Sequence, residues 1–416
     1  MRPTVVLSWG MGVESTAILV RWILEPSTRP CPLTDLIILT AQTGDEYLDT
    51  AAAAERHILP LLCQHQIRLV QVARHGHLES DGITLLDDSR SPHTLCLAGD
   101  YTLSQELQAS GVVPQYGAEH LCSMKFKASP IQRWLGANLH PSRQLNIWHP
   151  NFATAAPPST TAGERMAFGF NADEGRRATR RKHYDTRTRT GFFPLIEWGW
   201  TREDCQRYLD RVLGTRWKKS CCVFCPFSKV TGDLLARQRA HPIQVGQALL
   251  IEHLSLALNP RGSLYPHRTL LEITEQADNR EALIAFEARL ASFPWAVYRV
   301  RRIYTAKGKA QRAVERIRTV STEIQAQGEL EAIALAGHLS IEWIRRTPHA
   351  RFARRQDHHY PTREGYYVIA PALVHTKAPF GLPRFNQDWG AVRRPHLTAR
   401  PHWDLDIAPA LSSGIR

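Results

Sequence analysis

A buried strand, a glycine-bearing turn and a helix open the chain, and this order limits the fold more than any other feature. Residues 4–8 are apolar and β-branched, which is typical of a buried strand. Gly10 and Gly12 lie in the turn, and a helix is predicted over residues 14–24. The same pattern predicts a strand, a helix and a strand at residues 36–41, 47–64 and 67–72. A β-α-β-α-β order implies parallel strands with right-handed crossovers, so we expect an α/β fold.

The middle of the chain carries weaker structural signals. We expect a loop or lid over residues 75–100 and a helix over residues 129–139. A flexible insertion is expected over residues 150–163, followed by strands at residues 166–170 and 191–195. Ser129 is expected to cap its helix, with Pro130 at the first helical position. Thr201 is expected to cap a further helix, because acidic residues follow it in the first turn.

The periodicity becomes helical beyond residue 230, which indicates a second domain. Helices are predicted at residues 234–240, 244–258, 279–291 and 311–327. We therefore expect an α/β domain over residues 1–230, a mainly helical basic domain over 231–375, and a proline- and arginine-rich tail over 376–416.

The composition indicates a protein that works outside membranes. No run of about 18 apolar residues occurs, and the N-terminus lacks a signal-peptide pattern. We therefore expect a soluble, cytoplasmic protein. Its 52 Lys and Arg residues against 39 Asp and Glu give a net charge of +13. A basic surface attracts polyanions, so nucleic acid or a phosphorylated ligand is expected.

The turn after the first strand has the composition of a phosphate-binding loop. Small residues allow backbone N–H groups to face an anion, and the helix N-terminus adds a partial positive charge. Ser15 and Thr16 add hydroxyl groups at the same place. The alternative is a tight strand-to-helix turn that needs glycine for its geometry alone.

Residues 10–16 are in register with the Ser-Gly-Gly-x-Asp/Asn-Ser-Thr loop of the PP-loop ATP pyrophosphatase and phosphoadenosine phosphosulfate (PAPS) reductase superfamily, which the chain resembles. Val13 stands where many members carry lysine, and Glu14 where they carry Asp or Asn. No Walker A motif is present. Three later segments resemble the family's other motifs in the family's order, namely Thr43–Thr50, Gly169–Arg177 and Phe193–Thr201. The resemblance covers residues 5 to about 230 and implies a Rossmann-like fold of the adenine nucleotide alpha hydrolase type.

The resemblance also implies roles for individual residues. ATP, or PAPS, would be bound by Ser8, Gly10, Gly12, Glu14, Ser15, Thr16, Thr43 and Asp173. The catalytic residues would be Asp45, Glu174, Arg177 and Cys221. Asp45, Asp173 and Glu174 would hold Mg²⁺ or ribose, and Arg177 would meet phosphate or the second substrate. The alternatives are helix capping for Asp45 and a solvated loop for residues 169–177.

The cysteines form a second candidate site. Cys221, Cys222 and Cys225 lie in one short segment, and Cys122 lies in a region resembling the Cys-x-x-x-Lys-x-x-Pro motif of PAPS-reductase-like proteins. The resemblance implies that Cys122, Cys222 and Cys225 hold a [4Fe–4S] cluster, with Cys221 as a fourth ligand or a sulfur carrier. Nearby lysines would offset the cluster's negative charge. Zn²⁺, a redox dithiol or persulfide carrier, and unligated thiols remain alternatives.

Two basic stretches could contact nucleic acid. The first runs from Arg176 to Arg189, and the second covers residues 298–309 with interleaved tyrosines. A solvated surface is the alternative for the first stretch, and core packing of the tyrosines is favoured for the second.

Three functions remain in view. The leading hypothesis is that the chain splits ATP into AMP and pyrophosphate, adenylates an acceptor, and transfers sulfur to it, as the DNA phosphorothioation and tRNA thiolation enzymes of this superfamily do. The acceptor would be nucleic acid, and a cysteine desulfurase could supply sulfur. The second is a sulfonucleotide reductase, which the absence of any cysteine after Cys225 disfavours. The third is a non-catalytic module that binds a nucleotide or nucleic acid.

Overall fold

The computed structural model describes most of the 416-residue chain. The described residues are 4–114, 121–139, 147–148, 164–182, 185, 189–306, 310–356, 360–376 and 383–392. The expected insertion at residues 150–163, two lysines of the second basic stretch and most of the C-terminal tail lie outside this part.

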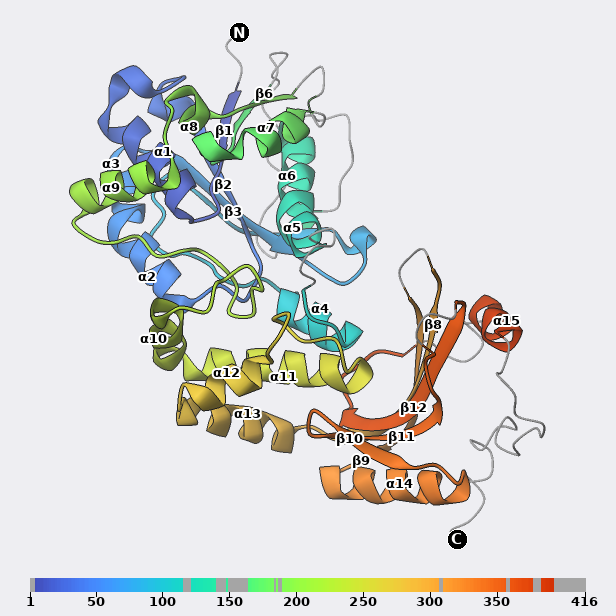
Figure 1. Ribbon diagram of the computed structural model, residues 1–416. Coiled ribbons are helices and arrows are strands. Elements are labelled where there is room, and N and C mark those ends of the chain that lie inside the picture. Colours follow the sequence, from blue (N-terminus) through green and yellow to red (C-terminus); the bar gives the residue numbers. More distant parts are fainter. Residues whose placement is uncertain are drawn as a thin grey trace. The chain divides into compact units, whose positions relative to one another are not determined.

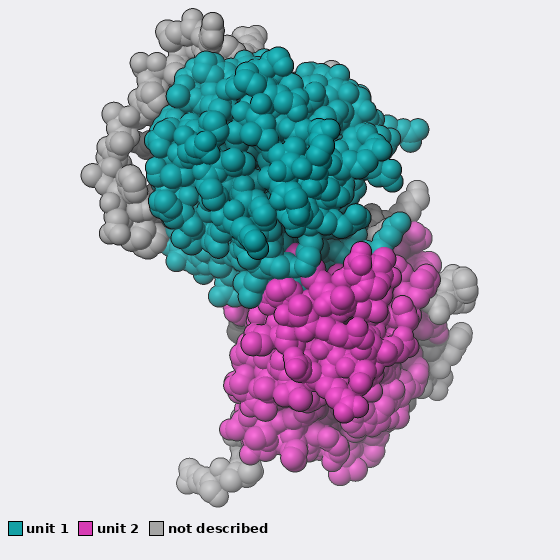
Figure 2. All heavy atoms as spheres, turned by 90° about the vertical axis from the view of Figure 1, so that its left-hand side faces the viewer, with its two compact units in different colours: residues 1–106, 117–229 teal, residues 107–116, 230–416 magenta. Residues whose placement is uncertain are grey.

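The chain divides into two compact units, which Figure 2 colours teal and magenta. The first contains residues 1–106 and 117–229, and the second contains residues 107–116 and 230–416. Residues 107–116 join the second unit through main-chain contacts that the sequence did not predict. The backbone N–H of His375 donates to the carbonyl of Ala109 at 2.8 Å, and Arg312 donates to the carbonyl of Ser110 at 2.7 Å.

The first unit is built on a seven-stranded sheet, shown in Figure 1. Its strands are β1 (Thr4–Ser8), β2 (Leu36–Gln42), β3 (Arg68–Arg74), β4 (Ile83–Ser89), β5 (Ile147–Trp148), β6 (Glu164–Ala167) and β7 (Arg189–Phe192). They run in the order β5-β4-β3-β2-β1-β6-β7, and every neighbouring pair is parallel except β3 and β4. The expected α/β class is confirmed, with a mixed sheet.

Strand β4 corrects the expectation of a loop or lid over residues 75–100. Gly82 has a φ angle of 84°, which turns the chain back beside β3. Ile83 and Thr84 then pair antiparallel with Arg74 and Ala73. The sequence pattern missed this strand because only its first two residues are buried.

Helices cover both faces of this sheet. The helices that begin in the first unit are α1 (Val13–Leu24), α2 (Leu48–His57), α3 (Leu59–Gln64), α4 (Leu103–Ser110), α5 (Leu121–Ser123), α6 (Ser129–Leu139), α7 (Gly175–Lys182), α8 (Pro194–Glu197) and α9 (Arg202–Leu213), and of these α4 continues into the second unit. Leu36 and Ile38 of β2 belong to the core that includes α1, α2 and α9, whereas Ile37 and Leu39 belong to the core with α6. Alternate residues of the strand therefore serve opposite layers.

Two predictions about the helices of this unit need correction. The helix expected over residues 47–64 is interrupted at Ile58, because Pro60 lacks the N–H that would continue the ladder. Ser129 is the first residue of α6, as expected, but it does not cap the helix, since its own backbone is helical and a π-helix over Met124–Ala128 precedes it. The capping role of Thr201 is confirmed, because its hydroxyl accepts the N–H of Asp204.

The second unit combines helices with an antiparallel sheet, so the expectation of a mainly helical domain is wrong. The helices are α10 (Gly232–Ala240), α11 (Pro242–Leu258), α12 (Leu270–Gln276), α13 (Arg280–Ser292), α14 (Glu323–Ala336) and α15 (Pro383–Ala391). The strands are β8 (Trp295–Tyr304), β9 (Gln311–Val320), β10 (Ile341–Ile344), β11 (Thr347–Ala353) and β12 (Thr362–Pro371), in the order β10-β11-β12-β8-β9. No described helix combines the length and apolarity needed to cross a membrane.

Strand β9 replaces most of the helix predicted over residues 311–327. Its Arg312, Glu315 and Arg318 are spaced three residues apart, as in a helix with ion pairs between successive turns. In the structure the same charges pair across strands instead, because Glu315 meets Arg299 at 3.3 Å and Arg301 at 2.5 Å on β8. Tyr298 of β8 is fully buried, as the core-packing alternative anticipated.

Candidate functional site

The strand order of the first unit reverses at β1. From β1 the chain builds β2 and β3 on one side, and later β6 and β7 on the other. Because these strands are parallel, the loops that follow β1, β2 and β6 meet at one edge of the sheet (Figure 1). Open α/β sheets bind ligands at such a reversal, outside the carboxyl ends of the strands. Three of the four predicted motifs therefore converge.

Gly169 lies directly against the first turn of α1. A Cβ atom at Gly169 would sit 2.9 Å from the backbone nitrogen of Ser15 and 3.3 Å from the Cβ of Glu14. Real side chains do not approach a backbone this closely, so only glycine fits without displacing α1. The loop after β6 can therefore pack this closely against the first turn of α1 only because residue 169 has no side chain.

The N-terminus of α1 offers backbone amides to an anion. Gly12 is the N-cap in an extended conformation, and no side chain of the described residues caps the helix. The N–H groups of a first helical turn have no partner within the helix and carry its positive dipole end. Met11 has a left-handed φ of 59°, and a Cβ at Gly10 would face open space. This geometry suits phosphate.

The two hydroxyl groups at this helix start differ in direction. Thr16 is fully buried, and its hydroxyl accepts the indole N–H of Trp9 at 3.1 Å. This contact ties the Thr16 side chain to Trp9 in the core. The hydroxyl of Ser15 lies 3.4 Å from the Gly12 carbonyl, within the loop itself.

The other loop positions have separate surroundings. Glu14 forms an ion pair with Arg202 of α9, which removes its charge from any nearby phosphate. Val13 is fully buried in the core, so this position cannot present a side chain to the loop. Ser8 ends β1, immediately before the loop.

A segment that is distant in sequence, residues 217–220, supports the main chain of the phosphate loop. The indole of Trp217 donates to the carbonyl of Met11 at 2.9 Å, and the hydroxyl of Ser220 lies 2.8 Å from the carbonyl of Gly10. These contacts fix two consecutive peptide units on either side of the left-handed residue. Sequence reasoning missed both residues, because neither belongs to a motif and each lies more than 200 residues from its partner.

The acidic residues after β2 accept hydrogen bonds from segments that are distant in sequence. Asp45 accepts the backbone N–H of Ser104 at 2.7 Å, and burial raises its pKa to about 6. The helix-capping alternative therefore describes Asp45, although the capped helix is α4. Glu46, which the sequence did not single out, accepts from Thr50 at 3.1 Å, from Ser220 at 2.8 Å and from the Cys221 N–H at 2.6 Å. Burial raises its pKa as well.

The acidic turn after β6 is partly neutralised. Glu174 forms an ion pair with Arg177, whose guanidinium lies 4.6 Å from the ring centre of Phe170. Asn171 caps the turn by accepting the N–H of Asp173 at 3.0 Å. The carboxylate of Asp173 is exposed to solvent, so Asp173 is the acidic residue of this turn that remains open to a ligand.

The predicted thiols come together, with Cys221 facing away. Burial raises the pKa of Cys122, and the presence of the Cys225 thiol acts in the same direction. Burial also raises the pKa of Cys222, whose sulfur lies 3.2 Å from the Thr43 hydroxyl. The sulfur of Cys221 instead accepts the hydroxyl of Ser228 at 3.4 Å.

A lysine lies among these groups. The Lys127 ammonium acts against the burial effect at Cys122 and Cys222, and also at the Glu46 carboxyl. The Thr43 hydroxyl contacts the Cys222 sulfur, and Glu46 accepts the Cys221 N–H. These two contacts connect the cysteine segment to the loop after β2.

The thiols as placed do not fit a metal centre. Across the described ranges, no three Cys, His, Asp or Glu side chains are arranged to hold an ion. A cluster or zinc would require the Cys221 and Cys222 sulfurs to leave their present hydrogen bonds.

Metal analysis of anaerobically purified protein tests the cluster prediction. The prediction requires iron and visible absorbance in the wild type, and loss of both in Cys222→Ser, because thiolate ligands cannot be replaced by a hydroxyl without weakening iron binding. Cys63→Ser is the matched control, since Cys63 lies outside the cluster of thiols. A colourless preparation without iron or zinc would leave the thiols unligated.

Comparison with known proteins adds no assignment. The chain matches no protein-family model, no curated protein and no solved structure. Function must therefore be argued from the geometry and from the motif resemblance alone.

Proposed function

We propose that the chain binds ATP or a related adenylyl nucleotide at the N-terminus of α1 and uses it to adenylate an acceptor, with release of pyrophosphate. One observation carries this proposal. The first turn of α1, which no described side chain caps, lies at the reversal of strand order, and the glycine at position 169 places no side chain against it. A positive helix end at that position is a general anion site in open α/β sheets.

A divalent cation would accompany the phosphates. Asp45 and Glu174 are already engaged by Ser104 and Arg177, so Asp173 is the carboxylate we assign to Mg²⁺. The cation would neutralise phosphate charge. The loop amides would orient the chain of phosphates.

Charge supports nucleic acid as the acceptor. Arg176 and Arg180 are exposed on the same face of α7, which begins at the turn beside the loop, and the whole chain carries a net charge of +13. The thiols near Lys127 would then carry the sulfur that displaces AMP. A sulfur-donor protein such as a cysteine desulfurase would load them.

Nucleotide binding without turnover is the second candidate. It is favoured by Val13, which is buried where the related loops carry lysine, and by the hydrogen bonds that already engage Asp45. Such a chain would act as a nucleotide-sensing module with the same loop.

Incubation with labelled ATP and Mg²⁺ separates these functions. AMP and pyrophosphate are expected as products, since water can replace the acceptor in the absence of nucleic acid. Binding of ATP without AMP formation would support the sensing module. Sulfite release from PAPS would instead identify a sulfonucleotide reductase, and no heat of binding in calorimetry with ATP, AMP and adenylylsulfates would overturn the nucleotide site itself.

A further inference from the structure

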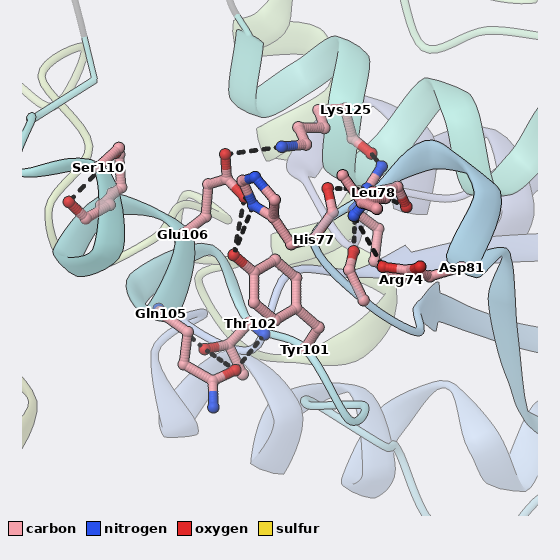
Figure 3. A network of polar contacts seen from close by, with 12 residues as sticks. Arg74, His77, Leu78, Asp81, Tyr101, Thr102, Gln105, Glu106, Ser110 and Lys125 are labelled. Atoms are coloured by element: carbon pink, nitrogen blue, oxygen red, sulfur yellow. Dashed lines mark hydrogen bonds and ion pairs between the residues drawn. The ribbon is translucent and has the colours of Figure 1, made fainter. Parts of the chain in front are cut away.

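A second group of polar side chains lies after β3, and of its members only Lys125 falls in a region that the motif resemblance covers. Its centre is Glu106 of α4, shown in Figure 3. One carboxylate oxygen accepts from the Lys125 ammonium at 2.6 Å. The other lies 2.8 Å from the Tyr101 hydroxyl and 2.9 Å from the Nδ1 atom of His77. The Tyr101 hydroxyl also lies 3.3 Å from this Nδ1 atom.

A buried arginine holds this group in place. Arg74 is 3% exposed and donates to the carbonyl oxygens of His77 at 2.8 Å, Leu78 at 3.1 Å and Lys125 at 3.3 Å. Figure 3 shows its guanidinium between the turn after β3 and the helical segment that carries Lys125. Arg74 therefore holds the backbone of both segments whose side chains contact Glu106, one carrying His77 and the other carrying Lys125. This favours a defined side-chain geometry.

The hydrogen bonds determine which nitrogen of His77 carries the proton. Burial raises the pKa of Glu106, but its bonds to Lys125, Tyr101 and His77 outweigh this effect and lower the pKa overall. Glu106 is therefore ionised at neutral pH and can only accept. Nδ1 of His77 must then carry a hydrogen, so in the neutral form of the ring the lone pair lies on Nε2. The His77 side chain is 57% exposed, so this nitrogen can be reached by a substrate.

The pair belongs to the same sheet edge as the phosphate loop. His77 follows Arg74, the last residue of β3, and β3 lies two strands from β1. Two strand spacings correspond to about 10 Å, which is within the length of a nucleotide and its acceptor. Glu106 also lies two residues after Ser104, whose N–H is held by Asp45 at the end of β2.

We infer that His77 is the general base of the adenylation step, and that Glu106 is the positioning residue that fixes its tautomer. This inference rests on the proposed function. The acceptor's oxygen forms a bond to the α-phosphorus of ATP while the bond from that phosphorus to the pyrophosphate oxygen breaks. The proton of the attacking hydroxyl or water passes to Nε2 of His77, which later releases it to solvent. Pyrophosphate leaves with the electron pair of the broken bond.

The rate of AMP formation from ATP and Mg²⁺, measured against pH with the full chain, tests this role. His77→Asn keeps an N–H donor near the position of Nδ1 and removes Nε2. We expect AMP formation to fall by about 10²- to 10⁴-fold, which is the usual contribution of general acid–base catalysis. The wild-type rate should decline as the pH falls and the base becomes protonated, and the variant should lose this acidic limb. ATP affinity should stay unchanged, because His77 does not touch the loop.

Two further variants complete the experiment. Glu106→Gln can donate its amide to Nδ1, which favours the tautomer with the hydrogen on Nε2, so it should also slow AMP formation and alter the pH profile. His93→Asn is the control, since His93 is an exposed histidine away from this group. The inference fails if wild type turns ATP over and His77→Asn keeps its rate and its acidic limb. A wild type that binds ATP but forms no AMP overturns the proposed enzyme function and the base together.

Discussion

Replacing Gly169 with alanine is expected to weaken ATP binding by about 5- to 150-fold, which corresponds to about 1–3 kcal/mol of overpacking strain. The added methyl group would lie 2.9 Å from the Ser15 nitrogen, which is a backbone atom and cannot rotate away. Relief requires α1 to move from the loop after β6, and this movement displaces the amides that we assign to phosphate. Isothermal titration calorimetry with ATP measures the loss.

Gly175→Ala is the matched control for this substitution. Gly175 starts α7 in a right-handed helical conformation, and a Cβ there would meet no atom within 4 Å. We expect its ATP affinity to remain within about twofold of wild type, because alanine also suits a helix. Equal affinity in Gly169→Ala and wild type would show that the nucleotide does not use the Ser15 amide, even if both proteins bind ATP.

The sequence predicted those parts of the fold that depend on short-range pattern. The strand, turn and helix over residues 4–24 follow from apolar runs and two glycines, and the structure places β1 and α1 there. Strand β9 was misread, because the spacing of Arg312, Glu315 and Arg318, three residues apart, suits ion pairs on a helix although the segment is a strand. Only the neighbouring β8, with Arg299 and Arg301 opposite Glu315, decides between them.

The candidate site divides in the same way. The phosphate loop could be located from its own residues, since the helix N-terminus is a local feature. The brace formed by Trp217 and Ser220 could not, because no spacing rule connects residues about 200 positions apart. The partner of Asp45 is likewise Ser104, 59 residues later, so this hydrogen bond at the start of α4 could not be foreseen from the motif around Asp45. Ligand roles of acidic residues depend on such distant partners.

In α11, burial shifts the pKa values of two neighbouring residues, Glu252 and His253, in opposite directions. Glu252 accepts the backbone N–H groups of Leu264 at 2.8 Å and Leu270 at 2.6 Å, yet burial raises its pKa to about 7. Burial lowers the pKa of His253 to about 4, and its Nε2 atom has no hydrogen-bond partner among the described residues. Near pH 5.5 the folded chain therefore holds its proton on Glu252, whereas the unfolded chain holds it on His253.

These two pKa shifts determine how the stability of the second unit depends on pH. A proton that is bound in both states leaves the free energy of unfolding unchanged with pH. Between about pH 4.5 and 6.5 the raised pKa of Glu252 and the lowered pKa of His253 have opposite effects, so their contributions should cancel. Removing either residue should expose the effect of the other.

The single variants are therefore expected to have opposite slopes. In His253→Leu, Glu252 remains, and its contribution to stability should be lost as the pH rises from about 4.5 to 7, by about 3 kcal/mol in total. In Glu252→Gln, His253 remains, and its contribution should be lost as the pH falls from about 6.5 to 4, by a similar amount of about 3 kcal/mol. Urea titrations followed by hydrogen exchange of residues 242–258 measure this unit separately, with the wild type as the reference at each pH. Parallel pH profiles in the two variants would mean that the two groups do not keep these protonation states in the folded chain.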